Sequence, residues 1–411
     1  MVKLIANRIR NAEKDFLIFL IVCMFLGIGQ SVDGSALSNF LKEKFHFLIL
    51  QRSALELPRE LPGFLVFAFI GFLSSLGDIR IAAVANATAA VGMFLLGVMP
   101  ADYMLLLIVM FVYSSGQHIY LPLSNTIGMS FADEKNFGRK LGQISAANTA
   151  ALVFGSAVLW TLFRFLKVDY MVAFSIGAAA FLAAAAMLLF MNPKRTVEIK
   201  NRFVFRKEYR LFYWLSVVNG ARKQIFLTFG PWVLVDVFKQ KVTTMTVLFF
   251  IISIAGVFFR PFFGYLIDRK GEKFVLGAEA AVLFFVCFLY AFASNVFPYG
   301  ITVIVICACY ITDQTFSAAG MARSTYLRKI AVKEEDVSPT LSLGTSLDHI
   351  VSMLLPALAG LVWYRGGVNG YKYVFVGGAL IALVNFISTR MMRIGKTEAD
   401  CNADIINTGL P

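Results

Sequence analysis

The stretch that decides the fold is Gly264-Tyr-Leu-Ile-Asp-Arg-Lys-Gly-Glu-Lys273, a short charged segment between two long apolar runs. The runs cover Thr246–Leu266 and Phe274–Ala293, and each is long enough to cross the hydrocarbon core of a bilayer as a helix. The charged segment is therefore predicted to be a very tight turn between two transmembrane helices.

The composition of the whole chain indicates the same class of protein. The 411 residues are 58% hydrophobic and only 15% charged, with a mean hydropathy of +0.73. A soluble protein of this size could not keep so much apolar surface from water. The net charge of +13 does not indicate a nucleic-acid-binding protein, because the basic residues lie mostly in alternate loops and not in one stripe. We predict an all-α polytopic membrane protein.

Apolar runs of spanning length fall into two sets of six. The first set covers roughly residues 15–38, 54–76, 81–99, 103–129, 141–165 and 170–191. The second set covers roughly residues 210–237, 243–266, 274–293, 297–325, 340–364 and 372–393. We predict an N-terminal six-helix bundle over 1–191, a cytoplasmic linker over 192–209, a C-terminal six-helix bundle over 210–393 and a cytoplasmic tail over 394–411.

The distribution of basic residues predicts the orientation of this bundle. With the N-terminus inside the cell, Lys and Arg crowd the inside loops and the linker, whereas the outside loops hold far fewer. These outside residues are Lys42, Lys44, Arg52, Arg164, Lys167, Lys239, Lys241, Arg365 and Lys372. By the positive-inside rule both termini are cytoplasmic. Compact loops and short termini favour a prokaryotic plasma membrane.

The turn pattern Gly264-x-x-x-Asp268-Arg269-x-Gly271-x-Lys273 resembles the loop signature of the major facilitator superfamily of transporters. A degenerate counterpart, recognisable by Gly71, Asp78 and Arg80, lies about half a chain earlier, as expected of an internal repeat. The resemblance implies twelve transmembrane helices in two pseudo-symmetric six-helix bundles. It also implies that these acidic and basic residues bridge the cytoplasmic ends of neighbouring helices and form a gate.

The chain departs from the family pattern in three places. Ser75 stands where the first loop is expected to carry an acidic residue, and Glu272 replaces an expected basic residue in the second loop. The fifth span lacks the Gly-Pro motif that is common in drug and proton antiporters of the family. The last departure weighs against a multidrug exporter.

Polar residues at helical spacing form stripes inside several spans. They include Glu56, Arg59 and Glu60 in span 2, Gln117 and His118 in span 4, Asn219, Arg222 and Lys223 in span 7, Asp313 and Gln314 in span 10, and Asp348 and His349 in span 11. Charged groups at membrane depth are expensive and usually functional. At about 1.5 Å per residue, the stripes of spans 4, 7, 10 and 11 reach mid-membrane, where a transporter holds its solute, whereas the span 2 stripe lies further out.

Each stripe has a functional and a structural interpretation. Asp313, Asp348 and His349 lie at one depth and are expected to perturb one another, which favours function. The adjacent cations Arg222 and Lys223 either neutralise these carboxylates or bind an anionic solute. The polar residues of spans 2 and 4 could instead be ion pairs and hydrogen bonds that join neighbouring helices.

The leading hypothesis is a secondary transporter of a small anionic or polar solute, working by alternating access and coupled to protons. No Gly-x-x-x-x-Gly-Lys-[Ser/Thr] phosphate loop is present to bind ATP within this chain. We expect Asp348, His349 and Asp313 to carry the proton, with Arg222 and Lys223 as their partners. We predict no cofactor, no resident metal and a monomer.

Two alternatives remain open at this point. A divalent-metal carrier could use Asp33, His118, Asp313, Asp348 and His349, although Arg222 and Lys223 would repel a cation. An intramembrane enzyme or receptor is disfavoured, because the metalloprotease and serine-hydrolase motifs are absent and the chain has no soluble domain to read out a signal.

Overall fold

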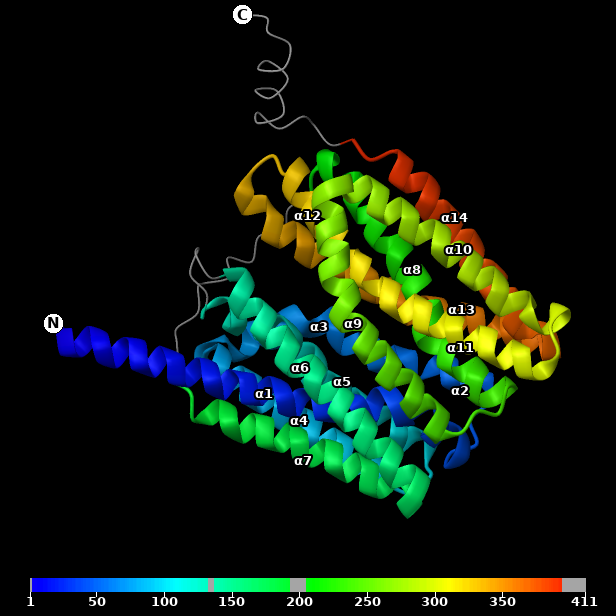
Figure 1. Ribbon diagram of the computed structural model, residues 1–411, viewed down its shortest axis with the longest axis horizontal. Helices are drawn as coiled ribbons and strands as arrows, with labels where there is room; N and C mark the ends of the chain where they lie inside the picture. The colour runs from blue at the N-terminus through cyan, green and yellow to red at the C-terminus, as the bar shows by residue number, and fades with distance from the viewer. Residues whose placement is uncertain (1, 132–136, 193–204, 394–411) are drawn as a thin grey trace, which may run out of the picture.

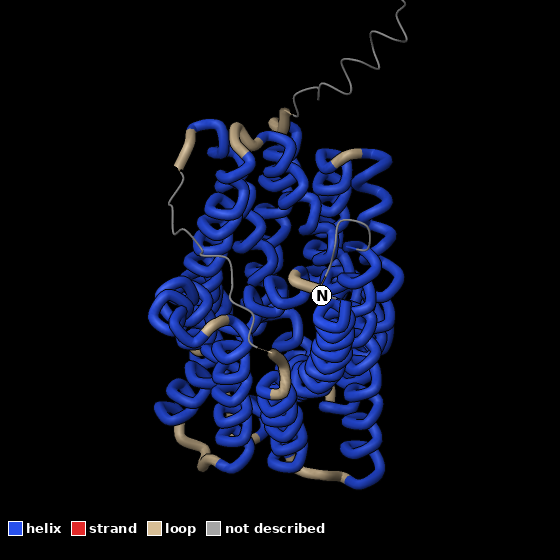
Figure 2. Tube along the Cα trace, turned by 90° about the vertical axis from the view of Figure 1, so that its left-hand side faces the viewer, coloured by secondary structure: helices blue, strands red, loops and turns tan. Residues whose placement is uncertain are grey.

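Helices account for all the regular secondary structure in the part of the chain that the structure describes (Figures 1 and 2). The computed structural model describes all residues except 1, 132–136, 193–204 and 394–411. Most of the predicted linker and the whole predicted tail lie outside the described residues. The predicted all-α fold is confirmed.

The N-terminal bundle holds the first six predicted spans. Its elements are α1 (Val2–Glu43), α2 (Ile49–Ala54), α3 (Glu56–Leu73), the 3₁₀ turn η1 (Ser74–Leu76), α4 (Asp78–Val98), α5 (Tyr103–Met129), α6 (Phe137–Thr161), the π-helical turn η2 (Leu162–Leu166) and α7 (Tyr170–Leu189). Span 2 is split into α2 and α3. Pro58 lies in the first turn of α3 and lacks an amide hydrogen to donate to the preceding turn, so the helix restarts there.

The C-terminal bundle holds the other six spans and lies beside the first bundle (Figure 1). Its elements are η3 (Lys207–Tyr209), α8 (Arg210–Trp232), the π-helical turn η4 (Val233–Val237), α9 (Val242–Lys270), α10 (Glu272–Val296), α11 (Tyr299–Phe316), η5 (Ser317–Gly320), α12 (Met321–Ile330), η6 (Glu334–Asp336), α13 (Val337–Gly366), η7 (Gly367–Asn369) and α14 (Gly370–Arg390). Span 10 is therefore α11 and α12, joined by the 3₁₀ turn η5.

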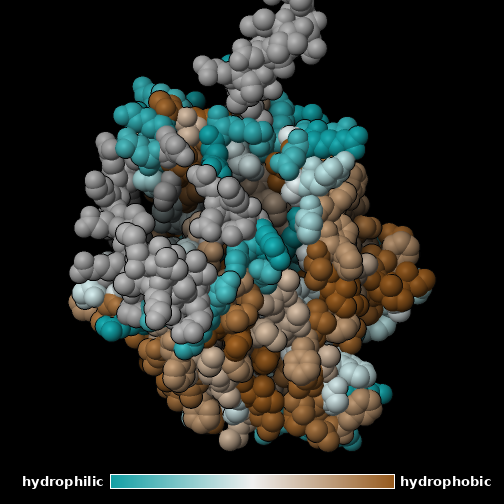
Figure 3. Space-filling view, turned by 60° about the vertical axis from the view of Figure 1, so that its left-hand side comes forward, coloured by the Kyte–Doolittle hydropathy of each residue, from teal (hydrophilic) through white to brown (hydrophobic). Residues whose placement is uncertain are grey.

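Nine stretches of the described chain are long and apolar enough to cross a membrane, and one of them, 339–390, contains both α13 and α14. The two spans that do not qualify, α3 and α8, are the ones that carry Glu56, Arg59 and Glu60 or Arg222 and Lys223. Large apolar side chains face outward, with Phe258, Phe285 and Ile304 each more than 60% exposed. Figure 3 shows hydrophobic residues covering the lower and right-hand surface, with hydrophilic residues gathered above them. This surface fits a bilayer.

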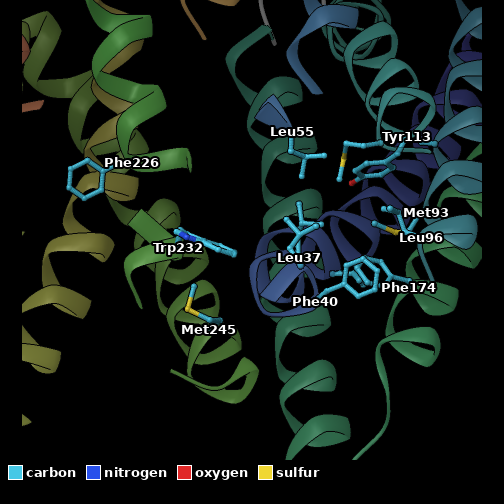
Figure 4. Packing of buried hydrophobic residues seen from close by; sticks show 14 of the residues in the cluster. Leu37, Phe40, Leu55, Met93, Leu96, Tyr113, Phe174, Phe226, Trp232 and Met245 are labelled. Carbon is cyan, nitrogen blue, oxygen red and sulfur yellow. The ribbon is translucent and has the colours of Figure 1, made fainter. Parts of the chain in front are cut away.

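Aromatic side chains pack the interior of each bundle. In the N-terminal bundle Phe40 of α1 meets Phe174 of α7 edge to face, with ring centroids 4.7 Å apart (Figure 4). In the C-terminal bundle Tyr290 stacks on Phe375 at 4.3 Å, and Phe226 of α8 meets Phe375 edge to face. Such pairs contribute about 0.5–1.5 kcal/mol each beyond their buried area. All these aromatic residues belong to one buried hydrophobic cluster that extends through both bundles.

The two loop signatures share one backbone feature. Gly77 and Gly271 both have positive φ, 78° and 82°, and each immediately precedes a helix, α4 or α10. Glycine adopts this conformation without the steric cost that other residues pay. The match places Asp78 in the position of Glu272, the first helical residue, and not in the position of Asp268. The participation of Asp78 in the gate stays a prediction.

The two bundles touch at the end that the positive-inside rule assigns to the outside, which we call the outer end. Lys42 of α1 forms an ion pair with Asp236 at 2.7 Å, and Asn39 Nδ2 donates to the Gln240 carbonyl oxygen at 2.9 Å. Where α2 meets α13, the helices are so close that a Cβ on Gly360 would overlap Ser53 Oγ. The outer end is closed by direct contact.

Candidate solute site and interbundle contacts

Helix α8 presents the two mid-membrane cations to two different helices. Arg222 donates to Asp313 of α11, and both side chains are 2% exposed. Lys223 donates to Asp348 of α13, with the two side chains 30% and 16% exposed. Consecutive helical residues point about 100° apart, so one cation is sealed in the bundle while the other reaches solvent. The interpretation that these cations neutralise the carboxylates agrees with the geometry.

Sequence reasoning missed two charged residues beside this pair. Glu279 of α10 is buried, and its charge acts on both Arg222 and Arg323 of α12. Glu279 Oε2 and Arg323 Nη1 are buried without a hydrogen-bond partner. A lone carboxylate inside the apolar run of α10 was a signal that could have identified Glu279.

A pocket of about 200 Å³ lies next to Lys223. It is lined from α8 by Phe212, Ser216, Asn219 and Lys223, from η5 and α12 by Gly320, Arg323 and Ser324, and from α13 by Leu341, Gly344, Thr345 and Asp348. Lys223 lies about 20 Å along α8 from its inner end. The pocket thus combines two cations, one carboxylate and several neutral hydrogen-bonding groups near mid-membrane.

Gly220 makes room for the pair that borders this pocket. A Cβ on Gly220 would lie 2.6 Å from Asp348 Oδ1 and 3.1 Å from Asp348 Cα. This close approach brings α13 against α8 and sets Asp348 within reach of Lys223. Gln314, which we expected in the site, instead donates from Nε2 to Asp313 Oδ2 at 3.2 Å and supports the buried pair.

His349 belongs to a different group from Asp348 and Asp313. His349 Nδ1 lies 2.9 Å from Glu60 Oε2, a contact that joins α13 of one bundle to α3 of the other. The rings of His349 and His118 meet edge to face with centroids 5.0 Å apart. The expected grouping of Asp313, Asp348 and His349 is therefore corrected: the three share a depth, but each has its own partner because their helix faces differ.

The outer-half cluster of span 2 also divides. Glu56 accepts hydrogen bonds from Arg52 and Arg59, and Gln224 Nε2 of α8 donates to its other oxygen at 3.0 Å. Arg52, which the sequence assigned to an outside loop, is 1% exposed on α2. Glu60 contacts His349 and not these arginines. The expectation that Glu56, Arg59 and Glu60 form a single cluster is therefore corrected.

The predicted metal-carrier residues do not converge either. Asp33 lies 3.7 Å from Arg59, while Asp313 and Asp348 face Arg222 and Lys223. His118 and His349 alone among the five come together. Gln117, next to His118, is half-buried and takes no part in these networks.

The predicted gate residues lie near the inner ends of α3, α4 and α9, and their role stays a prediction. Asp268 and Arg269 are exposed at the inner end of α9, and Arg269 donates to Tyr265 Oη of its own helix at 2.7 Å. Glu272 is buried and pairs with Lys329 of α12 at 2.9 Å, which gives the unusual residue of the signature a partner within the C-terminal bundle. Gly264 lies in α9, Gly71 in α3 and Arg80 in α4, and each is half-buried or exposed.

Comparison with solved structures supports the fold. A point mutant of the nucleoside transporter NupG is 16% identical with a TM-score of 0.74, covering 92% of this chain and 99% of that chain. A bacterial homologue of the human lysosomal transporter Spinster, inward-facing and occupied, is 13% identical with a TM-score of 0.70, covering 93% and 97%. No curated protein matches the chain by sequence.

A third comparison supports the same fold. A bacterial homologue of the iron transporter ferroportin has a TM-score of 0.71 in its inward-facing state, at 14% identity and coverage of 92% of this chain and 99% of that chain. The outward-facing state of such a homologue, with coverage of 92% and 98%, gives 0.61.

The family model described as "Major Facilitator Superfamily" matches residues 19–332, which include both loop signatures and most of both bundles. The described fold, the membrane-facing surface and the solved relatives all agree with that match. The chain therefore belongs to the Major Facilitator Superfamily, as an integral membrane transporter and not an enzyme.

Proposed function

We propose that this secondary transporter carries a small anionic solute, coupled to protons, with Lys223 and Asp348 at the centre of the mechanism. The observation that carries the proposal is the pocket beside Lys223, in which two cations, Lys223 and Arg323, face a single carboxylate. A carboxylate or phosphate group fits this charge balance, and Asn219 and Thr345 offer hydrogen bonds to the rest of the solute.

Exposure selects Lys223 over Arg222 as the cation that changes partners. Arg222 is sealed against Asp313, and separating that pair would leave two uncompensated charges in a low-dielectric interior. Lys223 and Asp348 are partly exposed to the pocket, so water and solute can reach both. An entering anion therefore competes with Asp348 for the Lys223 ammonium group.

This competition links the solute to a proton. When the solute anion pairs with Lys223, Asp348 is left as a carboxylate without its counter-ion. Taking up a proton removes that charge, so the solute and the proton each favour the binding of the other. The Glu60–His349 contact provides a second protonatable pair, which lies between the bundles and breaks when they separate at the outer end.

Solute flux in proteoliposomes tests the proposal. A thermal-shift screen of small carboxylates and phosphates, with a neutral nucleoside for comparison, selects the solute, and solute-driven pH change is then measured. We expect Asp348→Asn to reduce coupled proton flux at least tenfold and Lys223→Gln to weaken solute binding at least tenfold. Lys241→Gln is the control, because Lys241 lies exposed at the outer end, away from the pocket.

Two results would overturn the proposal. In one, Asp348→Asn retains both transport and its pH dependence. In the other, the nucleoside stabilises the protein while every carboxylate and phosphate fails to do so. The solved relatives do not choose among solutes, since their named cargoes differ and their identities of 13–16% support the fold alone.

We further propose that both termini are cytoplasmic, that the membrane is a prokaryotic plasma membrane and that the transporter acts as a monomer. The excess of Lys and Arg in the inner loops supports the orientation. Labelling of single cysteines at Ser130, at the inner end of α5, and at His46, at the outer end, with an impermeant maleimide tests it. In intact cells only the His46→Cys variant is expected to react.

A further inference from the structure

Three ligand-bearing side chains converge where the bundles meet. One ligand atom from each of Glu60, His118 and His349 lies within 4.8 Å of the others. They come from α3, α5 and α13, so two belong to the N-terminal bundle and one to the C-terminal bundle. By the helical rise, His118 and His349 lie about 16–18 Å from the inner ends of their helices. Two of the chain's three histidines therefore share one mid-membrane position.

The surroundings orient His118 toward the other two. Its Nδ1 lies 2.9 Å from Ser114 Oγ and 3.0 Å from the Ser114 carbonyl oxygen, so Nε2 is directed to the opposite side of the ring. Ser114 Oγ in turn donates to the Arg59 carbonyl oxygen. An imidazole that donates through one nitrogen to a backbone carbonyl keeps the other nitrogen unprotonated, which is the usual arrangement of a metal-binding histidine.

Space is kept for the two rings by a glycine. A Cβ on Gly63 of α3 would lie 2.5 Å from His349 Cε1 and 2.6 Å from His118 Cδ2. Any other residue at this position would therefore displace the imidazoles. The absence of a side chain at Gly63 allows both rings to lie directly against α3, one turn from Glu60.

The charges nearby favour a cation. Asp33, Glu56 and Glu60 supply three carboxylates to this region, whereas Arg52 and Arg59 supply two guanidinium groups. Glu56 and Asp33 contact these arginines directly, whereas Glu60 contacts His349. Glu60 is thus the carboxylate left to balance a positive charge supplied by a protonated histidine or by an ion.

We propose that Glu60, His118 and His349 bind a transition-metal ion such as Zn²⁺, and that the bound ion holds the transporter closed at the outer end. Two imidazole nitrogens and a carboxylate oxygen, with water in a fourth position, form a common zinc coordination set. Ligand atoms around Zn²⁺ are about 3.3–3.6 Å apart, so shifts of about 1 Å in the described side chains complete the site.

The bridging position makes this ion regulatory. Alternating access requires α3 and α13 to separate at the outer end, and an ion bound to Glu60, His118 and His349 connects them. It binds the inward-open state and not the outward-open state, so it shifts the population toward the former by the ratio of its two affinities. The ion is an inhibitor here, distinct from the solute bound near Lys223.

Zinc binding to the EDTA-treated, purified transporter tests the site directly. We expect micromolar Zn²⁺ to raise the unfolding temperature, and His118→Gln or His349→Gln to weaken the apparent affinity at least tenfold. His349→Cys keeps a zinc ligand and retains binding, which separates loss of the ligand from general damage to the fold. His46→Asn, a change at the exposed third histidine that tolerates its positive φ, behaves as wild type.

Conformation and flux supply the second readout. With spin labels at Ser130 and Arg328, on exposed inner-end positions of the two bundles, Zn²⁺ should enrich the inward-open distance and inhibit transport in wild type. In His118→Gln the inhibition, taken relative to that variant's own rate, should weaken at least tenfold. Equal stabilisation of all variants by Zn²⁺, or none in wild type, overturns the proposal. Uptake of radioactive Zn²⁺ into proteoliposomes also overturns it, because the ion would then be cargo.

Discussion

The two ion pairs of α8 allow one prediction with an internal comparison. Asp313→Asn and Asp348→Asn each remove one charge and keep the side-chain shape. The first leaves Arg222 buried without its partner, a change that typically costs about 3–5 kcal/mol. We expect about 3 kcal/mol, since Glu279 remains close enough to offset part of the charge. The second leaves Lys223 facing the pocket, where water solvates it, and should cost less than about 1 kcal/mol.

A double-mutant cycle isolates the pair energies. Arg222→Gln with Asp313→Asn removes one charge of each sign and leaves Glu279 beside Arg323, so the buried group stays balanced. The double variant should therefore be no less stable than either single variant, which gives a coupling free energy of at least about 3 kcal/mol. The corresponding cycle at Lys223 and Asp348 should couple by less than about 1 kcal/mol.

Denaturant unfolding in detergent micelles, followed by the fluorescence of the four tryptophans, measures both cycles. Variants are compared only where the slope of the free energy of unfolding against denaturant matches wild type. Two results would refute the assignment of the Arg222–Asp313 pair to structure and of the Lys223–Asp348 pair to the solute pocket. In one, the stability costs of the Arg222 and Asp313 variants are additive. In the other, the Lys223 and Asp348 variants couple as strongly as those at Arg222 and Asp313.

Three further outcomes are expected from the same structure. Asp268→Asn should change the transport rate more than solute affinity, because Asp268 is exposed at the inner end of α9, away from the solute pocket; a pure affinity change would contradict a role in the gate. Asp236→Asn removes the outer ion pair with Lys42. The population of molecules with the short, inner-closed spin-label distance should then rise by a factor of about 2–5. An unchanged distance distribution would show that this pair does not hold the outer end. Gly63→Ala should lower both zinc affinity and transport, because its methyl group would displace the two imidazoles. Gly300→Ala adds its methyl group to open space and should leave both unchanged. Equal effects of the two variants would show that Gly63 is not needed to make room for the histidines.

Much of the fold was predictable from apolar run lengths and loop charges. A bilayer leaves few options for a backbone that must satisfy its hydrogen bonds internally, so spanning runs become helices. The breaks in spans 2 and 10 were not predicted, although Pro58 was visible in the sequence. The alignment of the two loop signatures also needed the structure, because only the positive φ of Gly77 and Gly271 shows which residues correspond.

The residue types of the site were predictable, but their partners were not. Charge inside an apolar run is costly wherever the helix lies, so Arg222, Lys223, Asp313, Asp348 and His349 stood out from the sequence alone. Depth along a helix also follows from residue number. The direction in which each side chain points relative to other helices does not, since it depends on how six helices rotate and tilt against one another.

By itself, the sequence determined the class, the number of spans, the loop signature and the set of costly polar residues. Only the tertiary structure decided that Arg222 pairs with Asp313, that Lys223 and Asp348 face a pocket, and that His349 crosses to Glu60 in the other bundle. The physical reason is one of range. Burial, helix periodicity and loop charge act along the chain, whereas ion pairing inside a membrane depends on contacts between residues as far as 289 positions apart.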